Sequence, residues 1–460
     1  MQSTRIEHDS MGEVEVPVDA RWGAQTQRAM ANFGQEGGRF PVEVIHMVGL
    51  IKAAAATVSG RSDDVAAVDQ PAAAAIRAAA LEVAEGRWDD QFPVGVYQTG
   101  SGTSTNMNAN EVIASRASEL SGSRIDPNDH VNACQSSNDV IPSAVRLALR
   151  RSIVEDLVPG LGELRQAFLG RAERFAEVVK AGRTHLMDAA PVFLGDEMAG
   201  YADQIGRAMR SLATVDEFLL ELPLGGTAVG TGLNAPAGWA ADVRAELHAL
   251  GTPVLSGPQN QFASQSGQED LCDVSGRLRT VAVTLTKICN DLRLMASGPA
   301  TGLGEIVMPA LQPGSSMMPG KVNPVICESV LQVCARVVGN DATVTWGAAS
   351  GSLELNTFMP VIAMCLLEST VLLGSASRRL ATKCVTGIEA DVERCRTLAE
   401  ASGAVVTAAA PLIGYERAAA AVHTAIVEQR SVREVLLGEG VEESLLDELL
   451  SVERIARGGR

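Results

Sequence analysis

The sequence predicts a mostly α-helical protein with a bundle of long helices at its centre. Hydrophobic residues make up 46% of the 460-residue chain and aromatic residues only 3%, so aliphatic side chains must build the core. Two segments carry apolar residues at alternating spacings of three and four, the pattern of a long helix packed nearly parallel to its neighbours. The first stripe comprises Leu271, Val274, Leu278, Val281, Leu285, Ile288, Leu292 and Met295, and the second comprises Leu194, Met198, Tyr201, Ile205, Met209, Leu212, Val215 and Leu219.

Weaker helical patterns bring the predicted set to five long helices in the middle of the chain. These patterns lie at residues 143–178, 325–345 and 359–386. Before them, a strand-like stretch at Val14–Val18 is mixed with alanine-rich helices, and after residue 392 polar helices alternate with loops. We therefore predict three domains: residues 1–135, mixed but mainly helical; residues 136–392, the central long-helix bundle with a special loop at 312–324; and residues 393–460, small and helical.

Charge and cysteine content exclude several classes of partner. A net charge of −17 argues against nucleic acid, because phosphate backbones require clustered positive charge. The eight cysteines form no Cys-x-x-Cys pair and no metal-like cluster with histidine, so we expect reduced, mostly buried thiols and no metal. The sequence shows neither a basic leader followed by an apolar core nor an uninterrupted apolar run that could span a bilayer. We therefore expect a cytoplasmic protein with no membrane partner.

The segment Gly314-Ser-Ser-Met-Met-Pro-Gly-Lys-Val-Asn-Pro324 is predicted to be a shaped loop that binds an anion. Its glycines and prolines are too dense for a helix or a central strand. Backbone N–H groups beside glycine can approach a ligand closely, Lys321 offers a positive charge, and Asn323 adds an uncharged donor and acceptor. Taken alone, the loop is equally compatible with a turn-rich connection that carries an ordinary solvated lysine.

Two other segments are dense in small hydroxyl and amide side chains. They are Thr99-Gly-Ser-Gly-Thr-Ser-Thr-Asn106 and Cys134-Gln-Ser-Ser-Asn-Asp139. Such side chains suit carboxylate oxygens, because they donate hydrogen bonds without adding charges that must be desolvated. Each segment taken alone favours a helix N-cap. Their occurrence together with the lysine loop favours a carboxylate site, although the sequence does not show that the loops meet in space.

The lysine loop resembles the signature loop of the fumarase/aspartase superfamily, Gly-Ser-Ser-x-Met-Pro-x-Lys-x-Asn, at every fixed position. Within that superfamily the chain is similar to the class II fumarases. These typically have Thr-Gly-Ser-Gly-Thr and Ser-Ser-Asn-Asp, as at residues 99–103 and 136–139 here, whereas aspartases tend towards Gly-Ala-Gly-Thr and Ser-Thr-Asn-Asp. The resemblance covers nearly the whole chain, and further matching segments are Ile6–Gly12, Trp22–Gln27, Gly182–Leu186, Gly225–Gly230 and Ile413–Tyr415.

This resemblance implies a fumarase/aspartase fold with three domains and a central bundle of five long helices. Four copies of that bundle would form the helical core of a homotetramer. The implied reaction is the reversible addition of water to fumarate, giving (S)-malate, a step of the tricarboxylic acid cycle that needs no cofactor. Removal of a carbon-bound proton next to a carboxylate produces a carbanion that delocalises into that carboxylate, and the resulting dianion requires concentrated positive electrostatics.

The resemblance also implies the roles of five catalytic residues. Ser315 is expected to abstract the proton, while Lys321 and Asn323 stabilise the carbanion. His185 is expected to lie beside Glu328 and to assist proton transfer at the hydroxyl side, either as the acid or by ordering the site. Without the resemblance, Ser315 would be interpreted as a turn hydroxyl bonded to its own backbone, and His185 as a buried histidine with a satisfied hydrogen bond.

Further positions match the substrate contacts of the family. They are Ser101, Gly102, Thr103, Ser136, Ser137, Asn138, Thr184, Ser316, Lys321, Val322 and Asn323. In the family, several of these positions are contributed by different subunits. An isolated monomer is therefore expected to be inactive.

The chain departs from the family at a secondary anion site near the entrance of the active site. Class II fumarases usually carry His-Pro-Asn-Asp there, whereas this chain has Asp126, Pro127, Asn128 and Asp129. A carboxylate in place of the histidine should weaken dicarboxylate binding by like-charge repulsion. Other departures are Met187 and Asp196, where glutamine is common.

Two other classes of function remain open. An aspartate ammonia-lyase, or a related C–N lyase acting on a substituted succinate, would use the same loop and scaffold. A catalytically silent structural protein could also reuse the helical fold. The presence of Ser315, Lys321, Asn323, His185 and Glu328 disfavours the silent protein, because such a copy has no physical reason to keep that set.

Overall fold

The computed structural model describes residues 3–458 and is mostly helical, as predicted. The chain divides into two compact units, each assembled from three separate segments. Unit 1 consists of Met1–Val158, Arg210–Ala282 and Ala335–Leu373, and unit 2 consists of Pro159–Met209, Val283–Cys334 and Gly374–Arg460. Both units combine segments that are far apart in sequence, whereas the three predicted domains are consecutive stretches of the chain. The three-domain division therefore stays a prediction.

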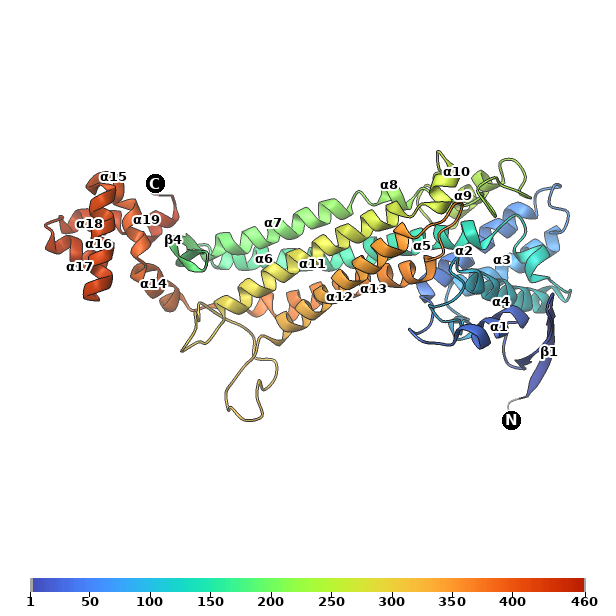
Figure 1. Cartoon of the computed structure of the whole chain (residues 1–460), viewed down its shortest axis with the longest axis horizontal. Coiled ribbons are helices and arrows are strands. Elements are labelled where there is room, and N and C mark those ends of the chain that lie inside the picture. Colours follow the sequence, from blue (N-terminus) through green and yellow to red (C-terminus); the bar gives the residue numbers. More distant parts are fainter. Residues whose placement is uncertain (1–2, 459–460) are drawn as a thin grey trace. The chain divides into compact units, whose positions relative to one another are not determined.

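Four helices form the centre of unit 1 (Figure 1). They are α2 (Val42–Ser59), α3 (Gln70–Ala84), α4 (Thr103–Ser121) and α5 (Ser137–Ser152), and α2 packs against both α3 and α5. A Cβ added at Gly49 of α2 would lie 2.7 Å from the backbone nitrogen of Ala84, so only glycine allows this close approach of α2 to α3. Gly49 therefore lets α2 and α3 pack closely.

Smaller elements surround these helices in unit 1. β1 (Thr4–Asp9) and β2 (Gly12–Pro17) pair as an antiparallel hairpin, which confirms the strand expected near Val14–Val18. The remaining elements are α1 (Ala24–Phe33), η1 (Asp89–Gln91), η2 (Pro127–Val131), η3 (Ile153–Leu157), α8 (Asp216–Leu219), α9 (Trp239–Ala249) and α10 (Gln261–Ser266).

Three long helices contribute one part to each unit. They are α11 (Glu269–Met295), α12 (Val325–Ala349) and α13 (Met359–Lys383). In unit 1, the carboxylate of Asp341 on α12 accepts hydrogen bonds from Ser275 (2.8 Å) and Arg279 (2.7 Å), both on α11. Every member of the first predicted apolar stripe lies on α11 and is at most 5% exposed, so this prediction is confirmed.

The second predicted stripe is divided between two helices. α7 (Leu194–Leu212) ends before the stripe does, and the last member, Leu219, lies on α8. The carbonyl of Ser211 accepts hydrogen bonds from the Thr214 hydroxyl (3.1 Å) and from Arg277 (2.7 Å). Side chains therefore satisfy a carbonyl that a continuing helix would pair with a backbone N–H, and the helix stops there.

In unit 2, α6 (Val158–Arg174) and α7 pack through an edge-to-face contact of Phe168 and Tyr201, with ring centroids 5.5 Å apart. β3 (Val179–Thr184) and β4 (Met187–Phe193) form a hairpin, and β5 (Ile306–Val307) pairs with β6 (Glu389–Ala390). The C-terminal helices are α14 (Val392–Ala401), α15 (Ala410–Ile413), α16 (Tyr415–Glu428), α17 (Val432–Gly438), α18 (Glu443–Leu449) and α19 (Val452–Ala456), with η4 (Val385–Gly387) before them and η5 (Gly403–Ala408) among them.

Two helical segments are long and apolar enough to cross a membrane. They are Val42–Ser59 and Met359–Gly387, and most residues in the apolar window of each are buried inside the protein, 72% and 67% respectively. This degree of burial is what core helices show.

Candidate active site

Hydroxyl side chains of the segments 99–106 and 134–139 meet at the N-termini of α4 and α5. Ser101 and Thr103 share a hydrogen bond of 2.7 Å, and Thr103 shares a second of 2.7 Å with Ser137. Thr103 is the first residue of α4 and Ser137 the first residue of α5. Both hydroxyls therefore lie where unpaired helix N–H groups and the positive end of the helix dipole favour an anion. We call Ser101, Thr103 and Ser137 the hydroxyl cluster.

Gly102 allows the two loops of the hydroxyl cluster to approach each other. Its backbone is in the left-handed region, with φ of 76°, which glycine adopts without a steric penalty. A Cβ at this position would lie 2.9 Å from a methyl carbon of Ile141 on α5. Any side chain here would therefore push α4 and α5 apart.

Ser136 is the N-cap of α5, which is the cap that the sequence favoured for this segment taken alone. Its hydroxyl accepts from the N–H of Asn138 at 3.2 Å, and the Asp139 carboxylate accepts from the N–H of Ser136 at 3.0 Å, which forms a capping box. The amide of Asn138 donates to the carbonyl of Ala228 at 2.8 Å. Ser137 thus joins the hydroxyl cluster, while Ser136 and Asn138 fix the loop around it.

Asp139 connects a third loop to this arrangement. Its carboxylate is fully buried and accepts from the N–H groups of Gly225 (2.9 Å) and Thr227 (3.0 Å). Burial raises the pKa of this carboxyl group, while the three backbone donors and the charge of Lys52 act in the opposite direction. The loop at 225–230, which matched the family by sequence, is therefore held next to the hydroxyl cluster by a buried anion.

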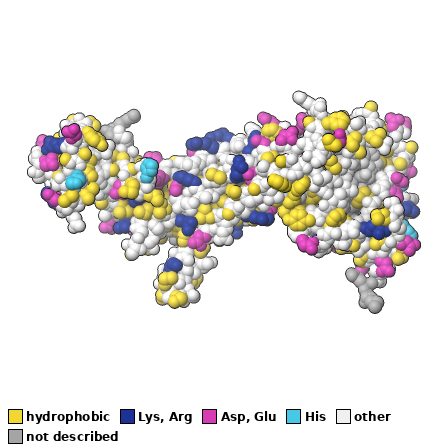
Figure 2. All heavy atoms as spheres, viewed as in Figure 1, with side chains coloured by type: hydrophobic (Ala, Val, Ile, Leu, Met, Phe, Trp, Pro, Cys, Tyr) yellow, Lys and Arg dark blue, Asp and Glu magenta, His cyan; other side chains and the backbone are white. Residues whose placement is uncertain are grey.

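The signature loop in unit 2 is closed on itself. The Ser315 hydroxyl accepts from the N–H groups of Met317 and Met318, both at 3.1 Å. Gly314 donates to the carbonyl of Lys321 at 2.8 Å, across the base of the loop. In Figure 2 the loop projects from the rest of its unit as a separate lobe. The structure thus shows the turn geometry that the residues alone favoured for Ser315.

The base of the signature loop leaves no room for a side chain at position 314. A Cβ on Gly314 would lie 2.4 Å from the Lys321 carbonyl oxygen. The Asn323 amide donates to the Gly314 carbonyl at 2.8 Å, so it also closes the loop. Ser316, Lys321 and Val322 are exposed, and their side chains are free to meet a ligand from outside the unit.

His185 lies at the exposed tip of the β3–β4 hairpin and is not the buried histidine that its sequence context alone favoured. His185 and Leu186 form the two-residue turn, with φ of 58° and 60°, a left-handed conformation that is unusual outside glycine and asparagine. Thr184 is exposed beside them. Glu328 is in the first turn of α12, and within residues 3–458 it forms no ion pair with His185. The predicted His–Glu pair is therefore not made inside one chain.

A buried ion network supports the hairpin that carries His185. Glu305 is 0% exposed and its carboxylate accepts from Arg183 at 2.8 and 3.0 Å. Lys180, also buried, lies 3.6 Å from Glu305 and 3.1 Å from Glu197. Sequence reasoning missed these partners. The available signal was Arg183, which stands two residues before His185 in a segment that matched the family.

In the loop predicted as a secondary anion site, the chain's own Asp126 carboxylate accepts the backbone donors. Asp126 accepts from the N–H groups of Asn128 (2.8 Å) and Asp129 (3.1 Å), so it caps the short helical turn η2. Asp126, Pro127 and Asn128 line a pocket of unit 1 near the β1–β2 hairpin. The sequence predicts that the charge of Asp126 repels a dicarboxylate. The structure shows in addition that the N–H groups of Asn128 and Asp129 already donate to Asp126.

We expect Asp126→His to increase dicarboxylate binding at this loop, because it removes both the repelling charge and the acceptor that occupies the two N–H groups. Equilibrium binding of succinate, compared with wild type, measures the change. Asp126→Asn is the matched control: it removes the charge and keeps a capping oxygen, so most of the block should persist. Equal binding by Asp126→His and wild type would contradict this interpretation.

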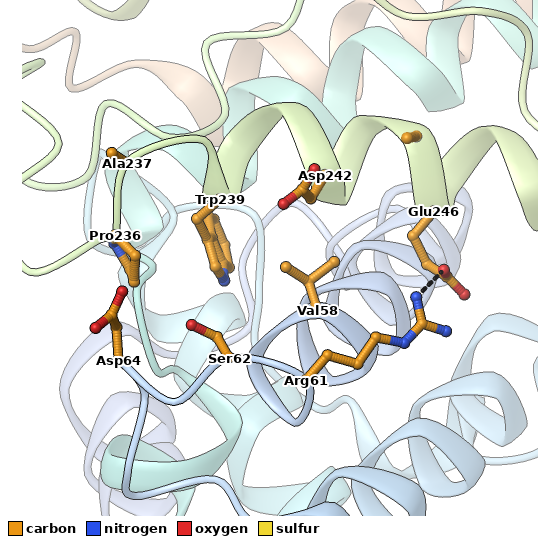
Figure 3. Close-up of a pocket in the computed structure, with 10 residues that line it drawn as sticks. Val58, Arg61, Ser62, Asp64, Pro236, Ala237, Trp239, Asp242 and Glu246 are labelled. Atoms are coloured by element: carbon orange, nitrogen blue, oxygen red, sulfur yellow. Dashed lines mark hydrogen bonds and ion pairs between the residues drawn. The ribbon is translucent and has the colours of Figure 1, made fainter.

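A further pocket of unit 1 lies between the end of α2 and α9 (Figure 3). An ion pair of 3.4 Å between Arg61 and Glu246 crosses it, and Trp239 forms one wall. None of the residues predicted for the site lines this pocket. The chemistry expected from the sequence therefore lies elsewhere.

The predicted residues fall into two groups, one in each unit. Unit 1 holds Ser101, Gly102, Thr103, Ser136, Ser137 and Asn138, and unit 2 holds Thr184, His185, Ser315, Ser316, Lys321, Val322, Asn323 and Glu328. Unit 1 thus provides hydroxyl and amide donors at helix N-termini. Unit 2 provides a lysine loop and a histidine on an exposed turn. Hydroxyl and amide donors, a lysine and a histidine are the residue types that the sequence predicted for a site that binds a small dicarboxylate.

Comparison with known proteins agrees with this class. The family model described as lyase matches residues 12–339, and the model described as fumarase C C-terminus matches residues 405–457. A class II fumarate hydratase of Mycobacterium tuberculosis is 49% identical over 454 residues, which cover 98% of this chain and 94% of that protein. One of Corynebacterium glutamicum is 48% identical over 467 residues, with 100% and 98% covered.

Solved structures share the fold as well. A crystal structure of recombinant class II fumarase from Schistosoma mansoni superposes with a TM-score of 0.96 at 36% identity and covers 100% of both chains. A fumarate lyase:delta crystallin from Brucella melitensis, in its native form, superposes with a TM-score of 0.90 at 43% identity, over 98% of this chain and 100% of that one. The chain belongs to the class II fumarate hydratase family. The mostly helical fumarase/aspartase fold expected from the sequence is thereby confirmed, and the tetrameric core stays a prediction.

Proposed function

We propose that this protein catalyses the reversible hydration of fumarate to (S)-malate. The observation that carries the proposal is 48% identity to a class II fumarate hydratase over 100% of this chain and 98% of that protein. The intact signature loop, with Ser315, Lys321 and Asn323 in place, supports it. The product and substrate place the enzyme in the tricarboxylic acid cycle, and the chemistry needs no cofactor.

In this mechanism the hydroxyl cluster and the N-termini of α4 and α5 bind a substrate carboxylate. Ser315 removes the proton from the adjacent carbon, and Lys321 and Asn323 stabilise the aci-carboxylate that forms. Thr184 and Ser316 add hydroxyl donors from the second group. The reaction is completed by proton transfer at the departing or arriving water, which we assign to His185 with Glu328.

The hydrogen bonds at Ser315 support its role as a base. Serine is a poor base in water, so it needs an environment that stabilises the alkoxide. The N–H groups of Met317 and Met318 already point at its oxygen at 3.1 Å, and donors of this kind stabilise the charged form more than the neutral one. Closure of the exposed loop over substrate would also exclude water.

We also propose a homotetramer in which the two groups of residues come from different subunits. Exposed apolar side chains support this assembly: Trp346 on α12 is 73% exposed, and Leu186 and Met187 at the hairpin tip are 71% and 70% exposed. The left-handed turn at His185 supports a functional role for this hairpin tip, since such conformations cluster at functional sites. We also propose a cytoplasmic location without nucleic-acid or membrane partners, which the net charge of −17 and the burial of the apolar helices support.

Shared active sites predict complementation between two inactive variants. Thr103→Val damages the group in unit 1 and Ser315→Ala damages the group in unit 2. After denaturation and joint refolding at equal amounts, we expect recovery of about a quarter of native activity, because that fraction of sites receives both intact groups. Each variant refolded alone is the control. Absence of recovery in a mixture that does form hybrid tetramers would contradict shared sites.

The proposed activity is tested by ultraviolet absorbance of fumarate. We expect fumarate to form from (S)-malate and not from aspartate, with no requirement for ammonia. The Ser315→Ala variant, purified in the same way, controls for contaminating enzyme. Release of fumarate from aspartate together with no turnover of malate would overturn the proposal in favour of an ammonia-lyase.

A further inference from the structure

Lys52 is a buried charge in the core of unit 1, on an otherwise largely apolar helix. Its relative exposure on α2 is 0%. Burial lowers the pKa of its ammonium group to about 7, and the nearby charge of Asp139 partly opposes that effect. Lysine is almost never fully buried unless it is paired. The partners of Lys52 should therefore explain why a charged residue is buried at this position.

The ammonium group of Lys52 binds the segment that precedes the loop at 134–139. It donates to the side-chain oxygen of Asn132 at 2.8 Å. The same oxygen accepts from the amide of Asn106 at 3.1 Å, and the amide of Asn132 donates to the carbonyl of Gln135 at 3.2 Å. Asn106 lies in the first turn of α4, next to Thr103. One buried lysine thus ties both hydroxyl-bearing loops to α2.

Asp139 extends this network to a third loop. It is the group whose charge acts on Lys52, and it is also fully buried. A positive charge nearby favours the ionised carboxylate, which is the form that accepts from all three of its backbone donors, Ser136, Gly225 and Thr227. Lys52 thus acts on the loops at 99–106 and 134–139 through Asn132, and its charge acts on Asp139, which holds the loop at 225–230.

We infer that Lys52 is a positioning residue for the carboxylate-binding half of the active site. It acts through Asn132 and Asp139 and touches no reacting atom. Its hydrogen bond to Asn132 and its charge opposite Asp139 hold Ser101, Thr103 and Ser137 in one arrangement. Because a displacement of about 1 Å weakens substrate positioning strongly, this buried contact should control affinity for a dicarboxylate. The inference rests on the proposed function and deepens it.

Lys52→Met tests the inference, because methionine keeps the length of the side chain and removes the charge and the donor. We expect the Kd for succinate, an unreactive dicarboxylate, and the KM for malate to rise about tenfold or more. Turnover at saturating malate should fall less than about threefold, since the groups on the signature loop are unchanged. Unchanged Kd and KM in a folded variant would overturn the inference.

Asn132→Ala probes the same contact from its other end. It should raise Kd and KM in the same direction, and the losses in the double variant Lys52→Met/Asn132→Ala should be less than additive, because both changes remove the hydrogen bond between Lys52 and Asn132. Fully additive losses would contradict a shared role. If Lys52→Met does not fold, Asn132→Ala alone decides: a normal Kd for succinate then overturns the inference.

Arg146→Met is the matched control for removal of a buried cation. Arg146 is 0% exposed on α5 and pairs at 3.7 Å with Asp270, outside the network of Lys52. We expect reduced thermal stability and a KM within about twofold of wild type. An equal rise in KM for this variant would show that any buried cation has the effect and would overturn the inference.

Succinate binding separates this inference from the proposed function. Wild-type protein that neither binds succinate nor turns over malate would refute the proposed function. Wild-type protein that does both, with a Lys52→Met variant that binds succinate equally well, would refute the positioning role alone.

Discussion

Replacement of Ser315 by alanine should reduce turnover by about 10²- to 10⁴-fold, the contribution typical of a positioned base. Among residues 3–458, the hydroxyl is hydrogen-bonded only within its own loop, where it accepts from the N–H groups of Met317 and Met318, and it carries no core packing. The variant should therefore fold and assemble normally. Steady-state kinetics with malate, together with the size of the assembly in solution, measures both expectations.

Met317→Ala is the control for a change in the same loop. Met317 is 87% exposed and stands at the variable position of the signature pattern, so its side chain should matter little to the chemistry. Near-normal turnover by Ser315→Ala would remove Ser315 from the role of base. An equally large loss in both variants would indicate that the loop conformation, and not the hydroxyl, was damaged.

Replacement of Lys321 by methionine should have the second large effect, a loss of about 10²- to 10³-fold in turnover. The charge of Lys321 is needed mainly when the second negative charge develops on the substrate, so turnover should fall more than KM rises. The side chain is exposed in the free chain, so removing it should leave the folded state nearly unchanged. Kinetics over a range of malate concentrations separates the two constants.

Lys383→Met provides the comparison for loss of an exposed lysine. It lies in the last turn of α13, in the same unit as the signature loop, and has no place in the proposed chemistry. Its kinetic constants should match those of wild type. If Lys321→Met raised KM alone and left turnover intact, Lys321 would be a substrate anchor and the stabilisation of the carbanion would have to come from other donors.

Local sequence was sufficient for several features of the fold. The stripe from Leu271 to Met295 predicted α11, because burial of an apolar face at helical spacing is what makes such a helix stable. The segment from Ser136 to Asp139 predicted a helix start, and the capping box confirms it. Proline and glycine kept the signature loop out of helix, as expected from their backbone restrictions.

Other features depended on residues far apart in the chain. Thr103 and Ser137 are hydrogen-bonded, but nothing in either loop specified that contact. The end of α7 depended on Arg277, which competes for the Ser211 carbonyl from another helix. Asp126 was predicted to be a departure from the family, and its action as a cap on η2 became visible only in the structure.

Lys52 shows most clearly where sequence reasoning ended. In the sequence it is one lysine within an alanine-rich segment, Leu50-Ile-Lys-Ala-Ala-Ala-Ala56, and such a residue is usually solvated. Only packing of α2 against α3, α4, α5 and α9 buries it and aligns it with Asn132. A lysine within an apolar helical segment was the available signal for a special role, but it did not indicate that Asn132 is the partner of Lys52.

Helices such as α11 and the loops between them could be predicted from the sequence alone, because periodicity, caps and backbone restrictions act over a few neighbouring residues. The chemistry of those loops was implied by the resemblance to the class II fumarases. The tertiary structure decided which loops meet: the hydroxyl cluster at two helix N-termini, the buried lysine behind it, and the histidine on an exposed turn. Such contacts join residues tens of positions apart. They arise from long-range packing, which no local pattern encodes.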